Sequence, residues 1–175
     1  MNPLHGLVII FSGEGKGKTS IALGMAFRAL GNGLRTSMLQ FVKQQETGEH
    51  RALARMSVPD MEILRLGTGF VLGGSPPAEA VAAAQHGLEI ARKKITGGRF
   101  DIVILDEIFP ALAAGLVTDR QVRDLVDLRP PHEHLVMTGR GAPAWAVERA
   151  DLVTEMRCIR HPGDRGVEAQ PGIEF

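Results

Sequence analysis

The chain has 175 residues, and its 20 Lys and Arg balance its 20 Asp and Glu, so the formal net charge at pH 7 is zero. Its 44% hydrophobic content excludes a disordered chain, which would combine low hydrophobicity with high net charge. A neutral chain with 5% aromatic residues also lacks the basic excess and the stacking side chains of nucleic-acid-binding proteins. We therefore expect a single domain over residues 1–175, with a small-molecule site and no nucleic-acid partner.

The cysteine content and the apolar runs bear on the compartment. Cys158 is the only cysteine of the sequence, so no internal disulfide framework is possible, which favours a reducing compartment. We expect Cys158 itself to be packed in the core, on a strand. The longest apolar runs, such as Leu7–Phe11 and Ile102–Leu105, are far too short to span a membrane. These features predict a cytoplasmic protein without a membrane partner.

Apolar runs of strand length alternate with amphipathic stretches of helix length in the first part of the chain. In chain order they are the strand Leu7–Phe11, the helix Thr19–Leu30, the strands Thr36–Phe41 and Met61–Leu66, the helix Pro77–Ile95 and the strand Ile102–Leu105. Glycine pairs follow both predicted helices, as is typical of helix ends. The two segments Val42–Glu49 and Gly67–Pro77 are polar or rich in glycine and proline, and we expect them to be loops over a binding site.

The same pattern continues after Asp106. It predicts a short helix capped by Thr118, a strand His134–Thr138, a helix around Ala144–Arg149, a strand Leu152–Ile159 and an extended segment from His161 to Phe175. The predicted strands Leu7–Phe11 and Ile102–Leu105 are apolar throughout, which is typical of a parallel sheet that helices cover on both faces. The sequence therefore predicts a three-layer α/β sandwich with a mostly parallel sheet of roughly six strands.

A loop rich in glycine and lysine follows the first predicted strand and leads directly into the first predicted helix. Binding a phosphate chain requires inward-facing amides, a helix N-terminus, a lysine and a hydroxyl group for a metal ion, and this loop supplies all four. It lacks only the first glycine of the pattern G-x-x-x-x-G-K-[ST], because Ser12 stands there. The residues predicted to bind the phosphates of ATP are Gly13, Glu14, Gly15, Lys16, Gly17, Lys18, Thr19 and Ser20.

Geometry suggests separate roles within this loop. Lys18 should neutralise the terminal phosphates, Thr19 should ligate Mg²⁺, and Lys16 should act as a second cation. The role of Glu14 is open, because a carboxylate near a triphosphate is repelled unless it points away or meets a sugar or a metal ion.

An apolar strand that ends in two carboxylates, Asp106 and Glu107, is the second informative motif. In phosphate-binding-loop proteins the strand beside the loop delivers an acidic residue to the metal ion. We therefore predict that Thr19, Asp106 and Glu107 hold Mg²⁺ or Mn²⁺. Together the two motifs narrow the fold prediction to a P-loop NTPase-like, RecA-like sandwich.

With those motifs placed, nearly the whole chain resembles the P-loop corrinoid adenosyltransferases, the ATP:cob(I)alamin and cob(I)yrinic acid a,c-diamide adenosyltransferase group. The matching segments are Gly13–Thr19, Gln40–Lys43, Gly48-Glu49, Gly67–Phe70, Asp106-Glu107, Arg129-Pro130, Thr138–Gly141, Ala150-Asp151 and Gly166–Phe175. The resemblance implies transfer of the 5′-deoxyadenosyl group of ATP to the Co(I) of a reduced corrinoid, with release of tripolyphosphate. It also implies adenosylcobalamin biosynthesis or salvage, an electron donor such as a flavoprotein, and ATP bound in the reverse of its usual orientation.

The nucleophile of this reaction belongs to the substrate, so the protein needs no activated serine, cysteine or general base. The expected catalytic residues are Lys18, Arg140 and Glu107, which would neutralise or hold the triphosphate leaving group. Other residues are expected on the corrinoid side of the site, namely Gln40, Lys43, Phe70 and Leu72. Members of the family usually have a tryptophan where Leu72 stands, and many have an N-terminal extension before the first strand, where this chain has six residues.

Two other functions are consistent with the same motifs. A P-loop ATPase or kinase would use Glu107 to orient water or an acceptor. A non-catalytic carrier would bind ATP and corrinoid without turnover. A homodimer is expected in any of these cases, because symmetric dimers are the commonest oligomers.

Overall fold

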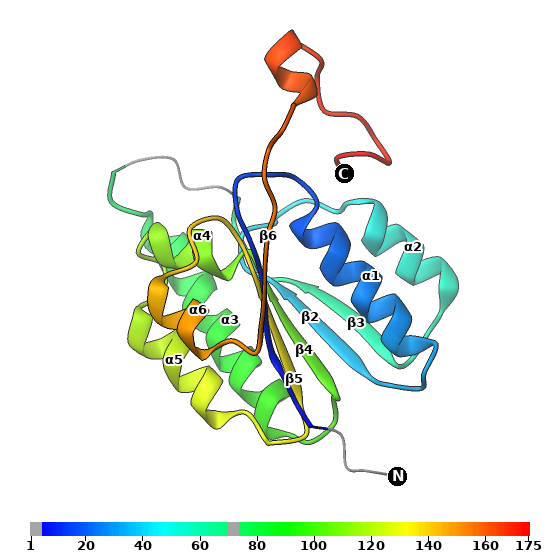
Figure 1. Ribbon diagram of the computed structural model, residues 1–175, viewed down its shortest axis with the longest axis vertical. Helices are drawn as coiled ribbons and strands as arrows, with labels where there is room; N and C mark the ends of the chain where they lie inside the picture. The colour runs from blue at the N-terminus through cyan, green and yellow to red at the C-terminus, as the bar shows by residue number, and fades with distance from the viewer. Residues whose placement is uncertain (1–4, 70–73) are drawn as a thin grey trace.

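In the computed structural model, which describes residues 5–69 and 74–175, the strands form one parallel sheet in the order β3-β2-β4-β5-β1-β6 (Figure 1). The strands are β1 (Val8–Ser12), β2 (Thr36–Gln40), β3 (Met61–Arg65), β4 (Ile102–Asp106), β5 (His134–Thr138) and β6 (Leu152–Glu155). The helices are α1 (Lys18–Leu30), α2 (Gly48–Met56), α3 (Ala78–Thr96), α4 (Ile108–Ala113), α5 (Asp119–Leu128) and α6 (Ala144–Arg149). The predicted sandwich with a parallel sheet is confirmed, and none of the described helices is long and apolar enough to cross a membrane.

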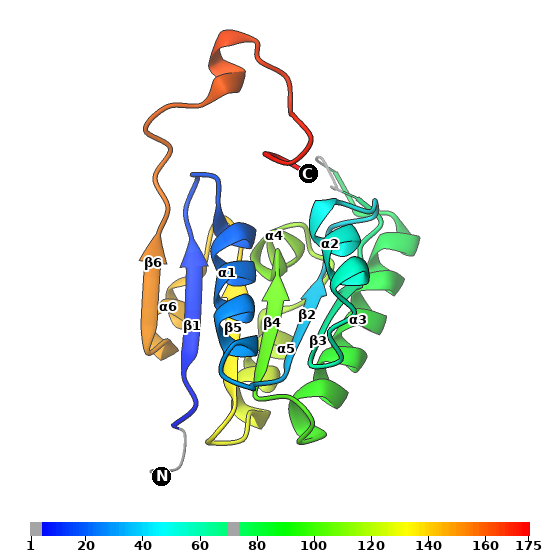
Figure 2. The ribbon, with the colours of Figure 1, turned by 90° about the vertical axis from the view of Figure 1, so that its right-hand side faces the viewer.

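Helices cover both faces of the sheet. α1 and α2 lie on one face, whereas α3, α4, α5 and α6 lie on the other (Figures 1 and 2). Successive residues of β1 serve the two layers in turn: Val8 and Ile10 pack into the core on the α3 and α5 side, and Ile9 and Phe11 pack against α1. This double coverage explains why the strands read as continuous apolar runs.

The strand register gathers several polar side chains at the carboxyl edge of the sheet. β2 and β4 pair so that Gln40 lies opposite Asp106, and β1 and β5 pair so that Phe11 lies opposite Thr138. Ser12 ends β1 at the same edge. In open parallel sheets this edge is where ligands bind, and all the loops with predicted function leave from it.

Two helices were not predicted from the sequence. Helix α2 is nine residues long and has no buried residue, and its cap pairs Thr47 with His50 instead of a glutamate or glutamine. Most of it follows the predicted loop Val42–Glu49. Helix α4 has six residues, including Pro110, which is too short for a helical period to be seen.

The chain leaves the sheet earlier than predicted. β6 ends at Glu155 and not at Ile159, because Glu155 pairs with Ser12, the last residue of β1, and no ladder remains beyond it. Cys158 is consequently exposed, so the prediction of a packed cysteine was wrong. The segment predicted to be extended contains a short 3-10 helix at Pro162–Arg165, whose amide groups are capped by the His161 side chain.

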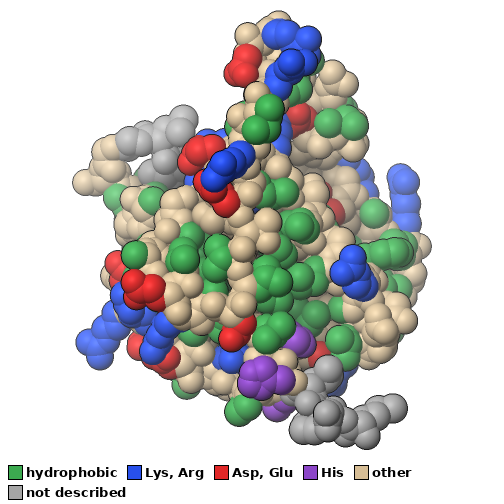
Figure 3. Space-filling model, viewed as in Figure 1, with side chains coloured by type: hydrophobic (Ala, Val, Ile, Leu, Met, Phe, Trp, Pro, Cys, Tyr) green, Lys and Arg blue, Asp and Glu red, His purple; other side chains and the backbone are tan. Residues whose placement is uncertain are grey.

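β6 is an edge strand with apolar side chains in contact with solvent. Val147 on α6 is 41% exposed, and Leu152 and Val153 on β6 are 41% and 42% exposed. Apolar side chains gather on this face of the molecule (Figure 3). Exposed edges of this kind are available for pairing with another chain.

A buried acid, Glu133, directly precedes β5, at the end of the sheet opposite to the carboxyl edge. The Glu133 side chain is fully buried, and neither of its carboxylate oxygens has a hydrogen-bond partner among the described residues. Burial raises the pKa of Glu133 to about 8, although the positive charge of Arg129 opposes the shift. The folded protein therefore holds a proton there that the unfolded chain would release near pH 4.5, the ordinary pKa of a glutamate.

This proton makes stability depend on pH. Between pH 4.5 and about 8 the folded state binds more protons than the unfolded state, so the contribution of Glu133 to stability falls as the pH rises and is constant outside this window. Glutamine at position 133 cannot titrate. The free energy of unfolding of Glu133→Gln minus that of wild type should therefore rise by up to about 1.4 kcal/mol per pH unit within this window. Urea unfolding at pH 5, 6.5 and 8 measures the difference. Glu148→Gln, at an exposed position, is the control, and a pH-independent difference for Glu133→Gln would contradict the buried, protonated acid.

Candidate active site

The glycine- and lysine-rich loop connects β1 to α1. Gly13 and Gly17 both have a φ of +103°, a conformation that side chains strongly disfavour, so the glycines of the motif are required by the path of the loop. The Gly15 amide donates to the carbonyl oxygen of Met156 at 2.7 Å, which ties the loop to the segment after β6. No side chain caps the start of α1, and its first amides are therefore free to meet an anion.

Lys18 lies inside this loop and is only 6% exposed. Its Nζ donates to the carbonyl oxygens of Gly13 and Gly15, each at 2.8 Å. Burial lowers the pKa of Lys18, and the negative charge of Glu107 opposes that shift. The lysine is thus a pre-positioned cation, held by the backbone of the same loop that would bind a phosphate.

Asp106 is the centre of a buried network at the end of β4. Its Oδ1 accepts hydrogen bonds from the hydroxyl groups of Thr19, at 3.0 Å, and Thr138, at 2.7 Å. Its Oδ2 accepts one from Nε2 of Gln40 at 3.2 Å. Burial raises the pKa of Asp106, and these hydrogen bonds act against the shift. The carboxylate therefore connects α1, β2 and β5 at one point.

Glu107 lies beside Asp106 in an unusual backbone conformation. Its φ is +58°, which costs a non-glycine residue free energy and is typical of functional sites. The Glu107 amide donates to Oγ1 of Thr138 at 3.0 Å, and this bond holds the turn in place. Burial and the adjacent charge of Asp106 raise the pKa of Glu107. Glu107 thus directly follows the buried Asp106, which contacts Thr19 of the loop.

Three more cations surround the site, and each forms an ion pair with a carboxylate. Lys43 pairs with Glu49, and Lys16 pairs with Glu174. Arg140, on the loop after β5, lies 3.4 Å from the Glu14 carboxylate. Burial alone would raise the pKa of Glu49, but hydrogen bonds from Lys43 and Thr47 lower it to about 2. Glu14, whose role the sequence left open, therefore points toward Arg140.

One cavity of about 1170 Å³ connects these groups. Its lining includes Gly15–Ser20, Lys43, Glu49, Glu107, Arg140 and Gly172–Phe175. Single ligands usually occupy cavities of about 300–1,000 Å³, so this one is large enough for a nucleotide. Gln40 is buried beneath the cavity, where it contacts Asp106 and Glu49. Phe70 and Leu72 lie outside the described residues.

Sequence reasoning assigned no role to Thr138, Glu49 or Glu174. Thr138 ends a predicted strand. Because the carboxyl ends of parallel strands meet at the edge where ligands bind, its place in the sequence could have indicated a role in the site. The partners of Glu49 and Glu174 depend on how loops fold back, which no local pattern encodes. Within residues 5–69 and 74–175, no cluster of three or more His, Cys, Asp or Glu side chains could hold a metal ion.

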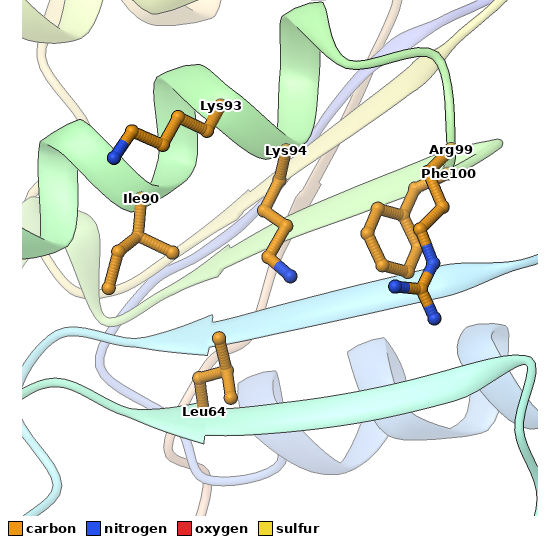
Figure 4. A pocket seen from close by; sticks show the side chains of 6 residues that line it. All are labelled: Leu64, Ile90, Lys93, Lys94, Arg99 and Phe100. Atoms are coloured by element: carbon orange, nitrogen blue, oxygen red, sulfur yellow. The ribbon is translucent and has the colours of Figure 1, made fainter.

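A second hollow, of about 420 Å³, lies between β3, the end of α3 and the start of β4 (Figure 4). Leu64, Ile90 and Phe100 form its apolar part. Lys94 lies over the Phe100 ring, 5.0 Å from its centroid, and also pairs with Glu62 at 2.6 Å. No predicted site residue lines this hollow, and Lys94 already has a carboxylate partner.

The fold and the loop together define a P-loop nucleotide-binding protein. The accessory flagellar protein FlaH from Methanocaldococcus jannaschii has a similar structure, with a TM-score of 0.58 over 87% of this chain and 71% of that chain, and 13% sequence identity. At this identity the likeness concerns the fold alone, which is the RecA-like sandwich that the motifs predicted.

Residues 4–175 match the family model described as ATP:corrinoid adenosyltransferase BtuR/CobO/CobP, and the chain belongs to that family. It is 36% identical to a corrinoid adenosyltransferase of Pseudomonas aeruginosa over 98% of this chain and 84% of the relative. It is 38% identical to one of a Sinorhizobium species, over 97% of this chain and 80% of the relative. The corrinoid adenosyltransferase CobA of Salmonella typhimurium is 31% identical, over 98% and 86%. The predicted resemblance is confirmed, and the chain is an ATP-dependent corrinoid adenosyltransferase of adenosylcobalamin biosynthesis.

Proposed function

We propose that ATP and a reduced corrinoid bind together in the cavity of about 1170 Å³, with the triphosphate on the loop Gly13–Ser20. The observation that carries this proposal is the convergence of two features on one cavity large enough for a nucleotide: the buried cation of Lys18 and the carboxylate of Glu107. Arg140 and Lys16 lie on the same cavity and would add positive charge around the phosphates.

The chemistry defines what the protein must supply. Co(I) attacks C5′ of ATP, a Co–C bond forms, and the C5′–O bond breaks with its electron pair leaving on tripolyphosphate, so cobalt is oxidised from Co(I) to Co(III). Lys18 and Arg140 would neutralise the charge that develops on the leaving oxygen. The protein need not abstract a proton, which agrees with the roles proposed for Asp106 and Glu107 as ligands and not as bases.

The residues around Asp106 fit a hard divalent cation such as Mg²⁺ or Mn²⁺. Thr19 and Asp106 already meet at 3.0 Å, and Glu107 lies next to them, so one hydroxyl group and two carboxylates form a set of oxygen ligands. When bound, the ion would supply positive charge to the phosphates. Thr138 and Gln40 would hold the Asp106 carboxylate in orientation by their hydrogen bonds.

The corrinoid would lie on the side of the cavity bordered by Lys43. The Gln40 side chain is fully buried, so it would not contact the corrinoid directly. It would orient the Glu49 and Asp106 carboxylates through its hydrogen bonds. Keeping cobalt as Co(I) requires an electron donor, and we propose a flavoprotein for this role.

We also propose a homodimer in the cytoplasm. The solvent-exposed apolar side chains at Leu152 and Val153 on the edge strand β6 support self-association there. The exposed free thiol of Cys158 is compatible with a reducing compartment.

Product analysis tests the proposed reaction. ATP and a chemically reduced corrinoid should yield tripolyphosphate and the absorption spectrum of an alkylated cobalt in equal amounts. An ATPase or kinase would instead produce ADP, and a carrier would produce neither. Formation of ADP and phosphate without a Co–C bond would rule out adenosyl transfer by this chain.

A further inference from the structure

The segment after β6 crosses back over the candidate active site. Residues 161–175 arch away from β6 and return above the carboxyl edge of the sheet, between the phosphate-binding loop and α2 (Figure 2). The part that lines the cavity is Gly172–Phe175. Within it, the Glu174 carboxylate pairs with Lys16 of the loop.

Glu174 is held firmly although its segment lies at the surface. Its side chain is 14% exposed, against 49% for that of Lys16. The backbone amide of Glu174 donates to the carbonyl oxygen of Gln170 at 2.8 Å. The backbone amide of Gly172 donates to the main-chain oxygen of Phe175, also at 2.8 Å, and the two bonds close a local turn. The hydrogen bonds of this turn therefore position the Glu174 carboxylate beside Lys16.

A carboxylate in this place has an electrostatic consequence for the substrates. Lys16 is the outer cation of the phosphate-binding loop, and an anion that already pairs with it competes with any phosphate for the same charge. Glu174 would also repel a bound polyphosphate through space. The repulsion is greatest for free tripolyphosphate, which carries more negative charge than the same three phosphates esterified to the nucleoside.

We propose that Glu174 is a positioning residue that holds Lys16 in the ligand-free protein and competes with polyphosphate for it, so that tripolyphosphate is released after adenosyl transfer. The competition means that ATP must take Lys16 from Glu174 on binding, and that Glu174 recovers it when the product leaves. This inference rests on the proposed binding of the triphosphate to the loop Gly13–Ser20.

Direct binding of inorganic tripolyphosphate tests the competition without corrinoid or turnover. Calorimetry should give a dissociation constant for Glu174→Gln that is roughly threefold to tenfold lower than for wild type, because one competing charge is lost. Glu174→Asp keeps the charge and should restore affinity close to that of wild type. Glu168→Gln changes an exposed carboxylate of the same segment and should have no effect. The gain in Glu174→Gln should shrink at high salt, because ions screen the competing charge.

A second variant separates competition from a merely structural role. In a Lys16→Met background the Glu174→Gln change should improve tripolyphosphate binding much less, because the shared cation is gone. In turnover assays Glu174→Gln should strengthen inhibition by added tripolyphosphate. Equal or weaker binding of tripolyphosphate by Glu174→Gln than by wild type would overturn the proposal. Failure of the wild-type protein itself to bind tripolyphosphate would instead contradict the proposed phosphate site.

Discussion

Replacing Lys18 by alanine is expected to lower the rate of adenosyl transfer by roughly 30-fold to 1,000-fold. One charge-assisted contact to a leaving group is typically worth about 2–4 kcal/mol, and each 1.4 kcal/mol corresponds to a factor of ten. Lys18 should reach the upper part of this range, because its ammonium group is almost fully buried and water could replace it only poorly. The loss should appear mainly in kcat, since the charge on the leaving oxygen grows as the C5′–O bond breaks.

The variant has a second expected effect, which a control must separate from the first. Lys18 also holds the carbonyl oxygens of Gly13 and Gly15, so its removal leaves these acceptors without that partner and loosens the loop. Thermal unfolding with and without ATP measures this structural cost. Lys93→Ala, at an exposed lysine on α3, should keep full activity. If Lys18→Ala turned over at the wild-type rate, the loop could not be the site that stabilises the leaving group.

Much of the fold could be predicted from the sequence because its signals are local. The strand β5 and the helix α6 have the bounds that their apolar patterns predicted, and Thr118 caps α5 through the predicted capping box. The elements that were missed lack such signals. Helix α2 is short and buries no residue, it follows directly on a polar segment, and its cap depends on the ring nitrogen of His50.

The candidate site divides in the same way. The phosphate-binding loop and the acidic strand end are contiguous motifs, and both could be read residue by residue. The hydrogen bonds of Asp106 to Thr138 and Gln40 arise only from the register of three strands, which the sequence does not state. The pairing of Lys16 with Glu174 joins residues at opposite ends of the chain and depends on the return path of the segment after β6.

Asp106→Asn is the other change with a large expected effect. Asparagine keeps the shape of the side chain but removes the charge that the proposed metal site needs, and loss of a metal ion's help to the phosphates is worth several kcal/mol. We expect the transfer rate to fall by about 100-fold or more at low Mg²⁺ concentration. Affinity for Mn²⁺ in the presence of ATP, measured by electron paramagnetic resonance, should fall as well. Asp60→Asn, at an exposed position before β3, is the control and should change neither the transfer rate nor the Mn²⁺ affinity.

The folded structure should tolerate this substitution, which makes the test decisive. The asparagine oxygen can still accept from Thr19 and Thr138, while its amide group would face Nε2 of Gln40. Oε1 of Gln40 is buried and has no partner among the described residues, so rotation of the Gln40 amide would give the new donor an acceptor, at the cost of the contact with Glu49. Asp106→Asn should therefore unfold within a few degrees of wild type. Wild-type Mn²⁺ affinity in a protein that folds this well would show that Asp106 supports the Thr19 hydroxyl group and does not contribute to metal binding.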